Sequence, residues 1–187
     1  MNTMPFLTQR FRIGFSILWL AGGLFSAVPD RPNIVVIIAD DLGWEECSPY
    51  GHPVVRTPNL QRLAAEGMRF DRFFLTASSC SPSRSSIFSG RYPHSTGTKD
   101  LHVDLSPDVP IFVEPLRAAG YHTMLVGKSH GTNHPMVRKK FDHLDLVDWS
   151  RPWTMGDMWE RALRERPRDR PFLLWAASID PHRPFRQ

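Results

Sequence analysis

Three apolar runs along the chain predict strands of a largely parallel sheet. The first run, residues 33–39, is rich in β-branched side chains and shows no polar alternation, which predicts a strand buried on both faces. Residues 121–126 and 172–178 form two further apolar runs of strand length. Each of the three runs leads into a polar cluster, and sites in open α/β sheets lie at the carboxyl ends of strands. We therefore expect an α/β fold with a functional site at one edge of the sheet.

Helical spacing and stop signals predict the remaining elements. The segments with apolar residues at helical spacing, or with a proline start and a glycine stop, are 57–67, 81–89, 110–120 and 155–164. In the third of these, Pro115 is tolerated only within the first helical turn. Residues 68–76 predict a further strand, and the three-residue spacing of Asp142, Asp145 and Asp148 predicts a solvated helix or turn.

The first 28 residues have the pattern of an export signal. Arg10 and Arg12 precede an uncharged, largely apolar run over residues 13–27. A membrane span usually needs about 20 residues, so we favour a cleaved signal peptide (1–28) over an uncleaved anchor. The mature chain, 29–187, is then predicted to be periplasmic or secreted.

Length and charge narrow the class of protein. At 187 residues, 41% of them hydrophobic, the chain supports one globular domain at most. The net charge of +4 is spread along the chain without a dense basic cluster, so we do not expect a nucleic-acid partner. The charge is compatible with an anionic substrate.

The two cysteines allow two interpretations. In an oxidising compartment Cys47 and Cys80 could form a disulfide. Alternatively, Cys80 serves a chemistry of its own and Cys47 is free and packed, and the context of Cys80 favours this second interpretation.

The pair Asp40 and Asp41 follows the first predicted strand directly. Adjacent carboxylates repel each other unless they are compensated. One interpretation is a solvated turn in which Asp40 caps a helix. The other is a pair of oxygen ligands for a hard divalent cation at the end of a strand.

Cys80 begins the segment Cys-Ser-Pro-Ser-Arg, ahead of a predicted helix. The N-terminus of a helix favours an anion, because its backbone N–H groups are unpaired and the helix dipole is positive there. Arg84 lies four residues further on, shares a helical face with residue 80 and can stabilise charge there.

Two further polar clusters follow the second and third strands. Lys128 and His130 point the same way in an extended segment, which suits an oxyanion site with a proton donor for a leaving group. A solvated turn is the alternative for Lys128. His182, in the cluster after the third strand, is either a turn residue or a member of the site.

These sequence motifs together resemble those of the type I sulfatases. Cys80-Ser-Pro-Ser-Arg84, followed by Ser-Ser-Ile-Phe-Ser-Gly-Arg, is similar to the family signature, and the opening strand with its aspartate pair is similar to the family's first strand. Gly-Lys-Ser-His is similar to the second signature, with Ser129 where tryptophan is frequent. The segment containing Asp180-Pro-His182 is similar to the active-site segment that binds the sulfate group. The sequences around Cys80 and His182 are especially similar to those of the heparan N-sulfatase (sulfamidase) branch.

The resemblance implies a fold, a cofactor and a reaction. The implied fold is α/β and alkaline-phosphatase-like, with a central mostly parallel sheet flanked by helices, of which this chain is the N-terminal portion. Cys80 is implied to be oxidised to formylglycine by a maturation enzyme, and Asp40, Asp41 and the residue 80 position to ligate Ca²⁺. A hydrated aldehyde has one hydroxyl to attack sulfur and a second to eliminate sulfate. Cys80, Arg84, Lys128 and His130 are implied to be catalytic, and His182 and Lys128 to bind substrate.

The implied activity is hydrolysis of a sulfate ester or sulfamate in a small molecule or polysaccharide. Two alternatives stay open: a phosphonate or phosphodiester hydrolase of the same superfamily, and an inactive fragment that binds sulfated glycans. Family members are much longer, and their remaining metal ligands lie beyond the residue that matches Gln187. We therefore expect this chain alone to bind calcium weakly and to turn over poorly.

Overall fold

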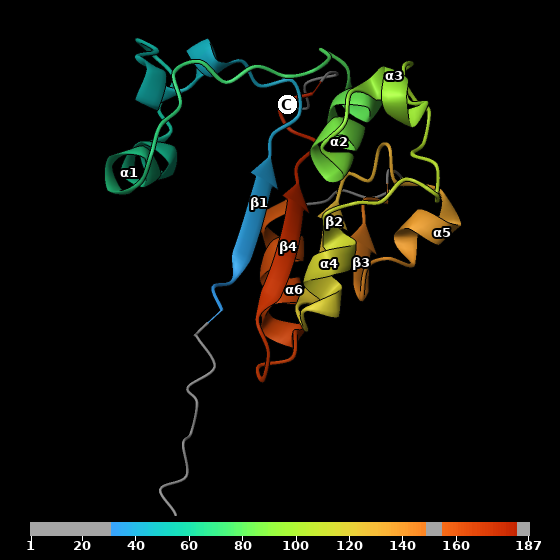
Figure 1. The fold of residues 1–187 in the computed structure, drawn as a ribbon. Coiled ribbons are helices and arrows are strands. Elements are labelled where there is room, and N and C mark those ends of the chain that lie inside the picture. Colours follow the sequence, from blue (N-terminus) through green and yellow to red (C-terminus); the bar gives the residue numbers. More distant parts are fainter. Residues whose placement is uncertain (1–30, 149–154, 183–187) are drawn as a thin grey trace, which may run out of the picture. The chain divides into compact units, whose positions relative to one another are not determined.

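A computed structural model describes residues 31–148 and 155–182 of the chain (Figure 1). The predicted signal peptide, 1–28, lies outside the described residues. Over the part that is described, no helix is both long and apolar enough to cross a bilayer. The elements in chain order are β1 (Ile34–Ile38), η1 (Trp44–Glu46), η2 (Ser48–Tyr50), α1 (Pro58–Glu66), α2 (Cys80–Ser89), α3 (Pro93–Thr96), α4 (Val113–Ala118), β2 (His122–Gly127), α5 (Pro135–Arg138), β3 (His143–Leu146), α6 (Met155–Glu165) and β4 (Phe172–Ala177).

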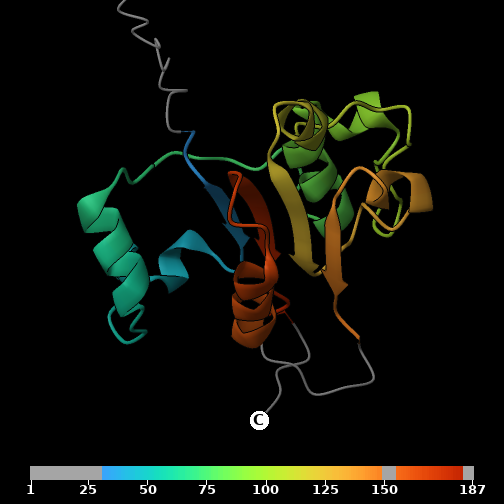
Figure 2. The ribbon, with the colours of Figure 1, turned by 90° about the horizontal axis from the view of Figure 1, so that it is seen from below.

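The described strands form one parallel sheet in the order β1-β4-β2-β3, as Figure 2 shows from blue β1 to orange β3. The predicted parallel α/β architecture is thus confirmed. In the register, Ile38 pairs with Ala177 and Gly127 pairs with the same alanine. The last residues of β1, β4 and β2 therefore lie side by side. The polar segments that follow these three strands leave the sheet at one edge.

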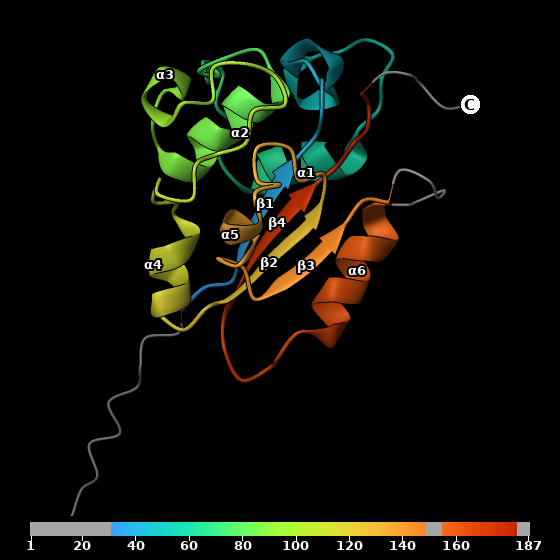
Figure 3. The ribbon, with the colours of Figure 1, turned by 90° about the vertical axis from the view of Figure 1, so that its right-hand side faces the viewer.

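The two faces of the sheet are covered by different helices (Figure 3). Successive residues of β4 alternate between the two faces, as the two-residue period of a strand requires. Leu173, Trp175 and Ala177 belong to the core that includes Phe88 of α2. Phe172, Leu174 and Ala176 belong to the core that includes residues of α6. Both faces of β2 and β4 are buried, which explains why their sequences are apolar without interruption.

The prediction for the first strand was only partly right. Ile34, Val36 and Ile38 pack against the core on the α2 side, but Val35 and Ile37 are 48% and 61% exposed. The run is apolar on both faces, yet α6 packs over β2 and β4, and no described element covers the same side of β1. An apolar run shows that a strand suits burial, but it does not show which neighbours cover it.

Two further local predictions were wrong. Residues 68–76 form no strand, and Phe73 and Phe74 are 78% and 83% exposed, because no described segment pairs with this stretch. The predicted helix or turn around Asp145 is instead β3, which pairs in parallel with β2. Leu144 and Leu146 alternate with polar neighbours there, a strand signal that the three-residue spacing of the aspartates obscured.

The helices were predicted more closely than the edges of the sheet. Helices occur at all four predicted segments, with ends shifted by a few residues. Pro115 is the third residue of α4, within the first turn, where its missing N–H does not cost a helical hydrogen bond. Glycine ends α2 as predicted, because Gly90 adopts a left-handed conformation with φ of 66°.

Candidate active site

Helix α2 brings residue 80 to the edge where the strands end. Ser79 precedes it in an extended conformation, so Cys80 is the first helical residue. Phe88, near the other end of α2, is 1% exposed and stacks on Trp175 of β4 with ring centroids 3.9 Å apart. This aromatic contact fixes the helix against the sheet. The first turns of α2 are buried although they are polar, which points to a site and not to a core.

Asp40 lies just beyond the end of β1 and is only 4% exposed. Its backbone N–H donates to the carbonyl of Asp180, 3.1 Å away in the segment after β4. Asp41, by contrast, adopts a positive φ of 61°, a conformation that aspartate tolerates better than most residues. The turn thus directs two successive carboxylates to different positions.

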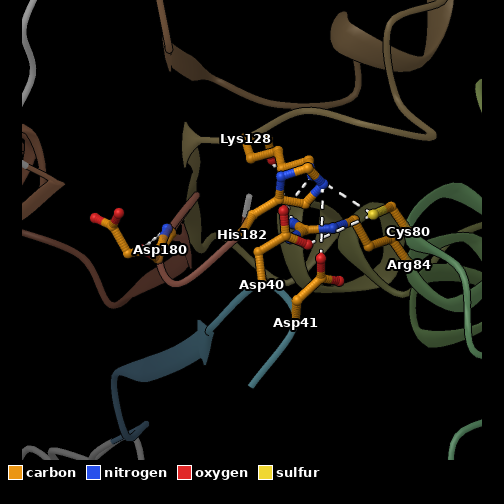
Figure 4. Close-up of polar contacts among 8 residues, drawn as sticks. Asp40, Asp41, Cys80, Arg84, Lys128, Asp180 and His182 are labelled. Atoms are coloured by element: carbon orange, nitrogen blue, oxygen red, sulfur yellow. Dashed lines mark hydrogen bonds and ion pairs between the residues drawn. The ribbon is translucent and has the colours of Figure 1, made fainter. Parts of the chain in front are cut away.

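Lys128 follows β2 and extends across the ends of the strands. Its backbone N–H donates to the carbonyl of Ala177 at 3.0 Å, which continues the pairing of β2 with β4. The side chain is almost fully buried, and its ammonium group forms an ion pair with Oδ2 of Asp40. The same ammonium lies 3.5 Å from the sulfur of Cys80 (Figure 4).

Arg84 provides the second cation of this cluster. Its guanidinium donates to Oδ1 of Asp40 at 3.3 Å and to the carbonyl of Lys128 at 3.4 Å. Burial by itself would raise the pKa of the Asp40 carboxyl. The hydrogen bond from Lys128 and the positive charges of Arg84 and Lys128 outweigh it and hold that pKa below its usual value. Asp40 is therefore ionised and doubly compensated.

The Cys80 thiol is a poor nucleophile in this setting. Its sulfur lies 3.6 Å from Oδ1 of Asp40, to which the thiol donates. Burial, and next the negative charge of Asp40, raise the pKa of the thiol, against the opposing effect of Lys128. Because the thiolate is the nucleophilic form of cysteine, an unmodified Cys80 is disfavoured as the attacking group.

His182 and Asp41 line the open side of the site. Nε2 of His182 is 3.7 Å from Oδ2 of Asp41, and both side chains are partly exposed. Together with Asp40, Cys80, Arg84 and several aliphatic residues, they line a cavity of about 480 Å³. Figure 4 shows that these side chains converge from different segments of the chain.

Part of a coordination shell for a cation is present. One ligand atom each from Asp40, Cys80 and His182 lie within 4.8 Å of one another. The carboxylates of Asp40 and Asp41 both line the adjoining cavity and are the donors that a hard cation prefers. Because Ca²⁺ takes 6–8 oxygens, these residues fit one side of such a site, and further oxygens must complete it.

His130 lies beside this cluster and not in its main cavity. With Lys128 it lines a smaller cavity of about 190 Å³. Its ring packs edge-on against that of His102 at 5.0 Å, and its Nδ1 is buried with no hydrogen-bond partner among the described residues. Burial, followed by the positive charge of Lys128 and the electrostatic effect of the His102 ring, lowers the pKa of His130 to about 4. His130 is thus neutral at ordinary pH.

Most of the predicted site residues lie close together, and the site also contains residues that the sequence did not predict. Asp40, Asp41, Cys80, Arg84, Lys128 and His182 surround one region, with His130 next to it. Leu75 and Leu101 of the cavity wall and His102 lie in irregular segments, where no periodicity marks them. Gly127 carries a recognisable signal, since glycine between a strand and a lysine suggests a tight approach of two backbones.

The two cysteines do not form a disulfide. Cys47 is buried and free, and Cys80 is free and partly exposed. The thiol of Cys47 lies 3.8 Å from the carbonyl of Gly43, within its own turn. The prediction that Cys47 is free and packed is confirmed.

The sequence has well-defined relatives. The sequence model of the family described as "Sulfatase" matches residues 32–187. Over 132 residues the chain is 37% identical to N-acetylgalactosamine-6-sulfatase of Rattus norvegicus, a match that covers 64% of this chain and 25% of that protein. Over 120 residues it is 42% identical to arylsulfatase A of Homo sapiens, covering 61% of this chain and 23% of that protein. The chain spans about a quarter of the length of these curated relatives.

Solved structures share the fold. A protein solved in complex with its substrate D-glucosamine-2-N,6-O-disulfate superposes with a TM-score of 0.75 at 28% identity, covering 82% of this chain and 35% of that one. The phosphonate monoester hydrolase of Agrobacterium radiobacter superposes with a TM-score of 0.64 at 20% identity, covering 81% of this chain and 41% of that one. At that identity the second likeness concerns the fold alone.

Proposed function

The chain belongs to the sulfatase family, and we propose that it carries the nucleophile side of an active site that hydrolyses sulfate esters or sulfamates. The observation that carries this proposal is a buried cluster at the carboxyl ends of the strands, in which Asp40 contacts the Cys80 thiol, Arg84 and Lys128, and Lys128 also contacts Cys80. A buried cluster of two cations, one carboxylate and the first turn of a helix suits the binding of a tetrahedral anion.

The proposal includes the conversion of Cys80 to formylglycine by a maturation enzyme. The raised pKa of the thiol supports it, because a protonated thiol is a weak nucleophile. When present, the hydrated aldehyde supplies one hydroxyl oxygen that bonds to sulfur while the ester oxygen leaves, and a second hydroxyl that expels sulfate. The surrounding residues position the sulfate group for these two steps.

We assign the following parts to the residues of this chain. Arg84 and Lys128 compensate the negative charge of the sulfate group and of the transition state. His182, at the rim of the cavity, contacts the sulfate oxygens. His130, neutral because of its low pKa, is suited to accept a proton or to orient a hydroxyl and not to act as a cation.

Calcium is the proposed resident metal. Asp40 and Asp41 would hold it, with the oxygen that replaces the sulfur of residue 80 as a further ligand. When bound, the cation would draw electron density from a sulfate oxygen and so favour attack on sulfur. The buried Asp40 carboxylate is ionised, as a ligand must be.

The proposed substrate is a sulfated sugar or another sulfated small molecule. The structural neighbour with D-glucosamine-2-N,6-O-disulfate as its substrate supports a sugar, and that substrate carries both an N-sulfate and an O-sulfate. We also propose that the protein acts outside the cytoplasm, because of the signal pattern in residues 1–28.

Intact mass and turnover test these proposals. In a host that carries the maturation enzyme, conversion of Cys80 should lower the mass by about 18 Da, as replacement of a thiol by an aldehyde requires. The loss should persist in Cys47→Ala and disappear in Cys80→Ala. An unmodified thiol would contradict the proposal. The gene product that contains this chain should cleave a sulfate ester faster than the matching phosphate or phosphonate ester, and the reverse order would favour the hydrolase alternative.

A further inference from the structure

We propose that the ammonium group of Lys128 and a divalent cation compete for the carboxylate of Asp40, so that a bound cation replaces the ammonium group there. The inference rests on the metal site under the proposed function and adds a step to it. Loading the metal would then also release the ammonium group of Lys128 for the substrate anion.

Both oxygens of Asp40 already have partners. Oδ2 is paired with the Lys128 ammonium, and Oδ1 is approached by Arg84 at 3.3 Å and by the Cys80 thiol at 3.6 Å. Asp40 is 4% exposed and Lys128 is 2% exposed, so water does not screen this pair as it would at the surface. A cation that binds Asp40 must therefore displace a group that is already there.

Lys128 is the partner that can leave. Arg84 is held a second time by the carbonyl of Lys128, at 3.4 Å. Within the described part of the chain, the other contact of the Lys128 ammonium is the sulfur of Cys80, at 3.5 Å. In the chain whose residue 80 is still cysteine, this thiol is a weaker acceptor than a carboxylate or a carbonyl, so it holds the ammonium less firmly. Lysine also carries its charge on a flexible four-carbon stem, whereas the guanidinium of arginine is a rigid fork.

There is room for the ammonium to move. Lys128 borders a cavity of about 190 Å³, lined also by Gly127, Ser129, His130, Asn133 and Val147. The lining is polar in part, so a charged group can find partners there. The proposed exchange places the displaced ammonium group in this cavity.

The exchange has a chemical consequence. The pairing with Lys128 and Arg84 neutralises the buried carboxylate of Asp40 and so lowers its affinity for a further cation. With the metal on Asp40, the ammonium group no longer neutralises a carboxylate. Lys128 would then add positive charge for a sulfate group only after the metal has bound.

Metal affinity provides the first test, with Tb³⁺ as a luminescent probe of the calcium site on the full chain. Lys128→Met should bind Tb³⁺ at least tenfold more tightly than the wild type, because the competing ammonium is gone. Lys99→Met removes the same charge from an exposed position and should leave the affinity within twofold. Asp40→Asn should abolish Tb³⁺ binding. Adding Lys128→Met to Asp40→Asn should not restore it. Unchanged affinity in Lys128→Met with binding lost in Asp40→Asn would overturn the exchange and leave the metal site standing.

The second test uses the unaltered chain and does not depend on how a variant folds. The chain is treated with an amine-reactive ester with and without saturating Ca²⁺, and labelling is read at each lysine by mass spectrometry. We expect labelling of Lys128 to be slow without Ca²⁺ and at least threefold faster with it, while Lys99 reacts equally in both. An unchanged rate at Lys128 under saturating Ca²⁺ would overturn the exchange. Absence of cation binding in all variants would overturn both the exchange and the proposed metal.

Discussion

Gly127, the last residue of β2, approaches the backbone of Ala177 so closely that no side chain fits between them. A Cβ atom on Gly127 would lie 1.9 Å from the carbonyl oxygen of Ala177, and the glycine has a positive φ of 105°. The next residue, Lys128, donates its N–H to that same carbonyl. The close contact of two strand ends therefore sets the point from which Lys128 reaches Asp40.

Gly127→Ala should destabilise the protein by at least about 2 kcal/mol, from the strained φ together with the displaced strand end. The measurement is urea unfolding followed by circular dichroism. Gly156→Ala is the matched control, because that glycine lies in α6 with nothing within 4 Å of the added methyl. The control should be neutral or stabilising by up to about 1 kcal/mol. Equal stability of the two variants would contradict the interpretation.

Phe88→Ala should cost about 3–5 kcal/mol of unfolding free energy, as expected for loss of a buried aromatic ring. The ring is 1% exposed and stacks on Trp175, so its loss opens a cavity between α2 and the sheet. Phe73→Ala is the control, since that ring is 78% exposed and its loss should change stability by less than about 0.5 kcal/mol. Tryptophan fluorescence should also shift in Phe88→Ala and stay unchanged in Phe73→Ala.

Asp40→Asn should destabilise the metal-free protein by about 3–5 kcal/mol, because it leaves two buried cations without a counter-charge. The side chains of Arg84 and Lys128 are 4% and 1% exposed in their pairs with Asp40. Unfolding is measured at neutral pH with a chelator. Asp71→Asn breaks an exposed pair with Arg69 and should cost at most about 1 kcal/mol. The double variant Asp40→Asn/Lys128→Met should recover part of the loss, and no recovery would argue against a shared charge cluster.

The lowered pKa of His130 predicts that the folded protein loses stability in acid. Its folded pKa is about 4, below the ordinary value of 6.5, so the unfolded chain takes up the proton first as the pH falls. The contribution of neutral His130 is therefore fully present above pH 6.5 and is lost progressively as the pH falls from 6.5 towards 4. His130→Gln should reduce the pH dependence of the unfolding free energy over this window. His94→Gln, an exposed control, should leave that pH dependence unchanged. An unchanged slope in His130→Gln would show that another group titrates.

The sequence by itself determined the four helical segments, the strands β1, β2 and β4, and a set of candidate site residues, but it missed β3 and predicted a strand over 68–76 that does not form. Uninterrupted apolar runs predict strands such as 121–126 and 172–178, because both faces of these strands face cores. Cys80 and Arg84 are assigned to one helix start by local signals alone. That polar side chains would meet followed from a general property of parallel sheets, whose carboxyl ends share one edge.

Only the tertiary structure decided which groups touch. The order β1-β4-β2-β3 brings Lys128 and Asp40 together across 88 residues of sequence, a contact that no local pattern encodes. It also leaves Val35 and Ile37 uncovered among the described elements, although their sequence suits burial. Local propensity acts within a few residues, whereas ion pairing and burial depend on which distant segments pack together. The sequence could therefore name candidate residues, but which of them lie together required the fold.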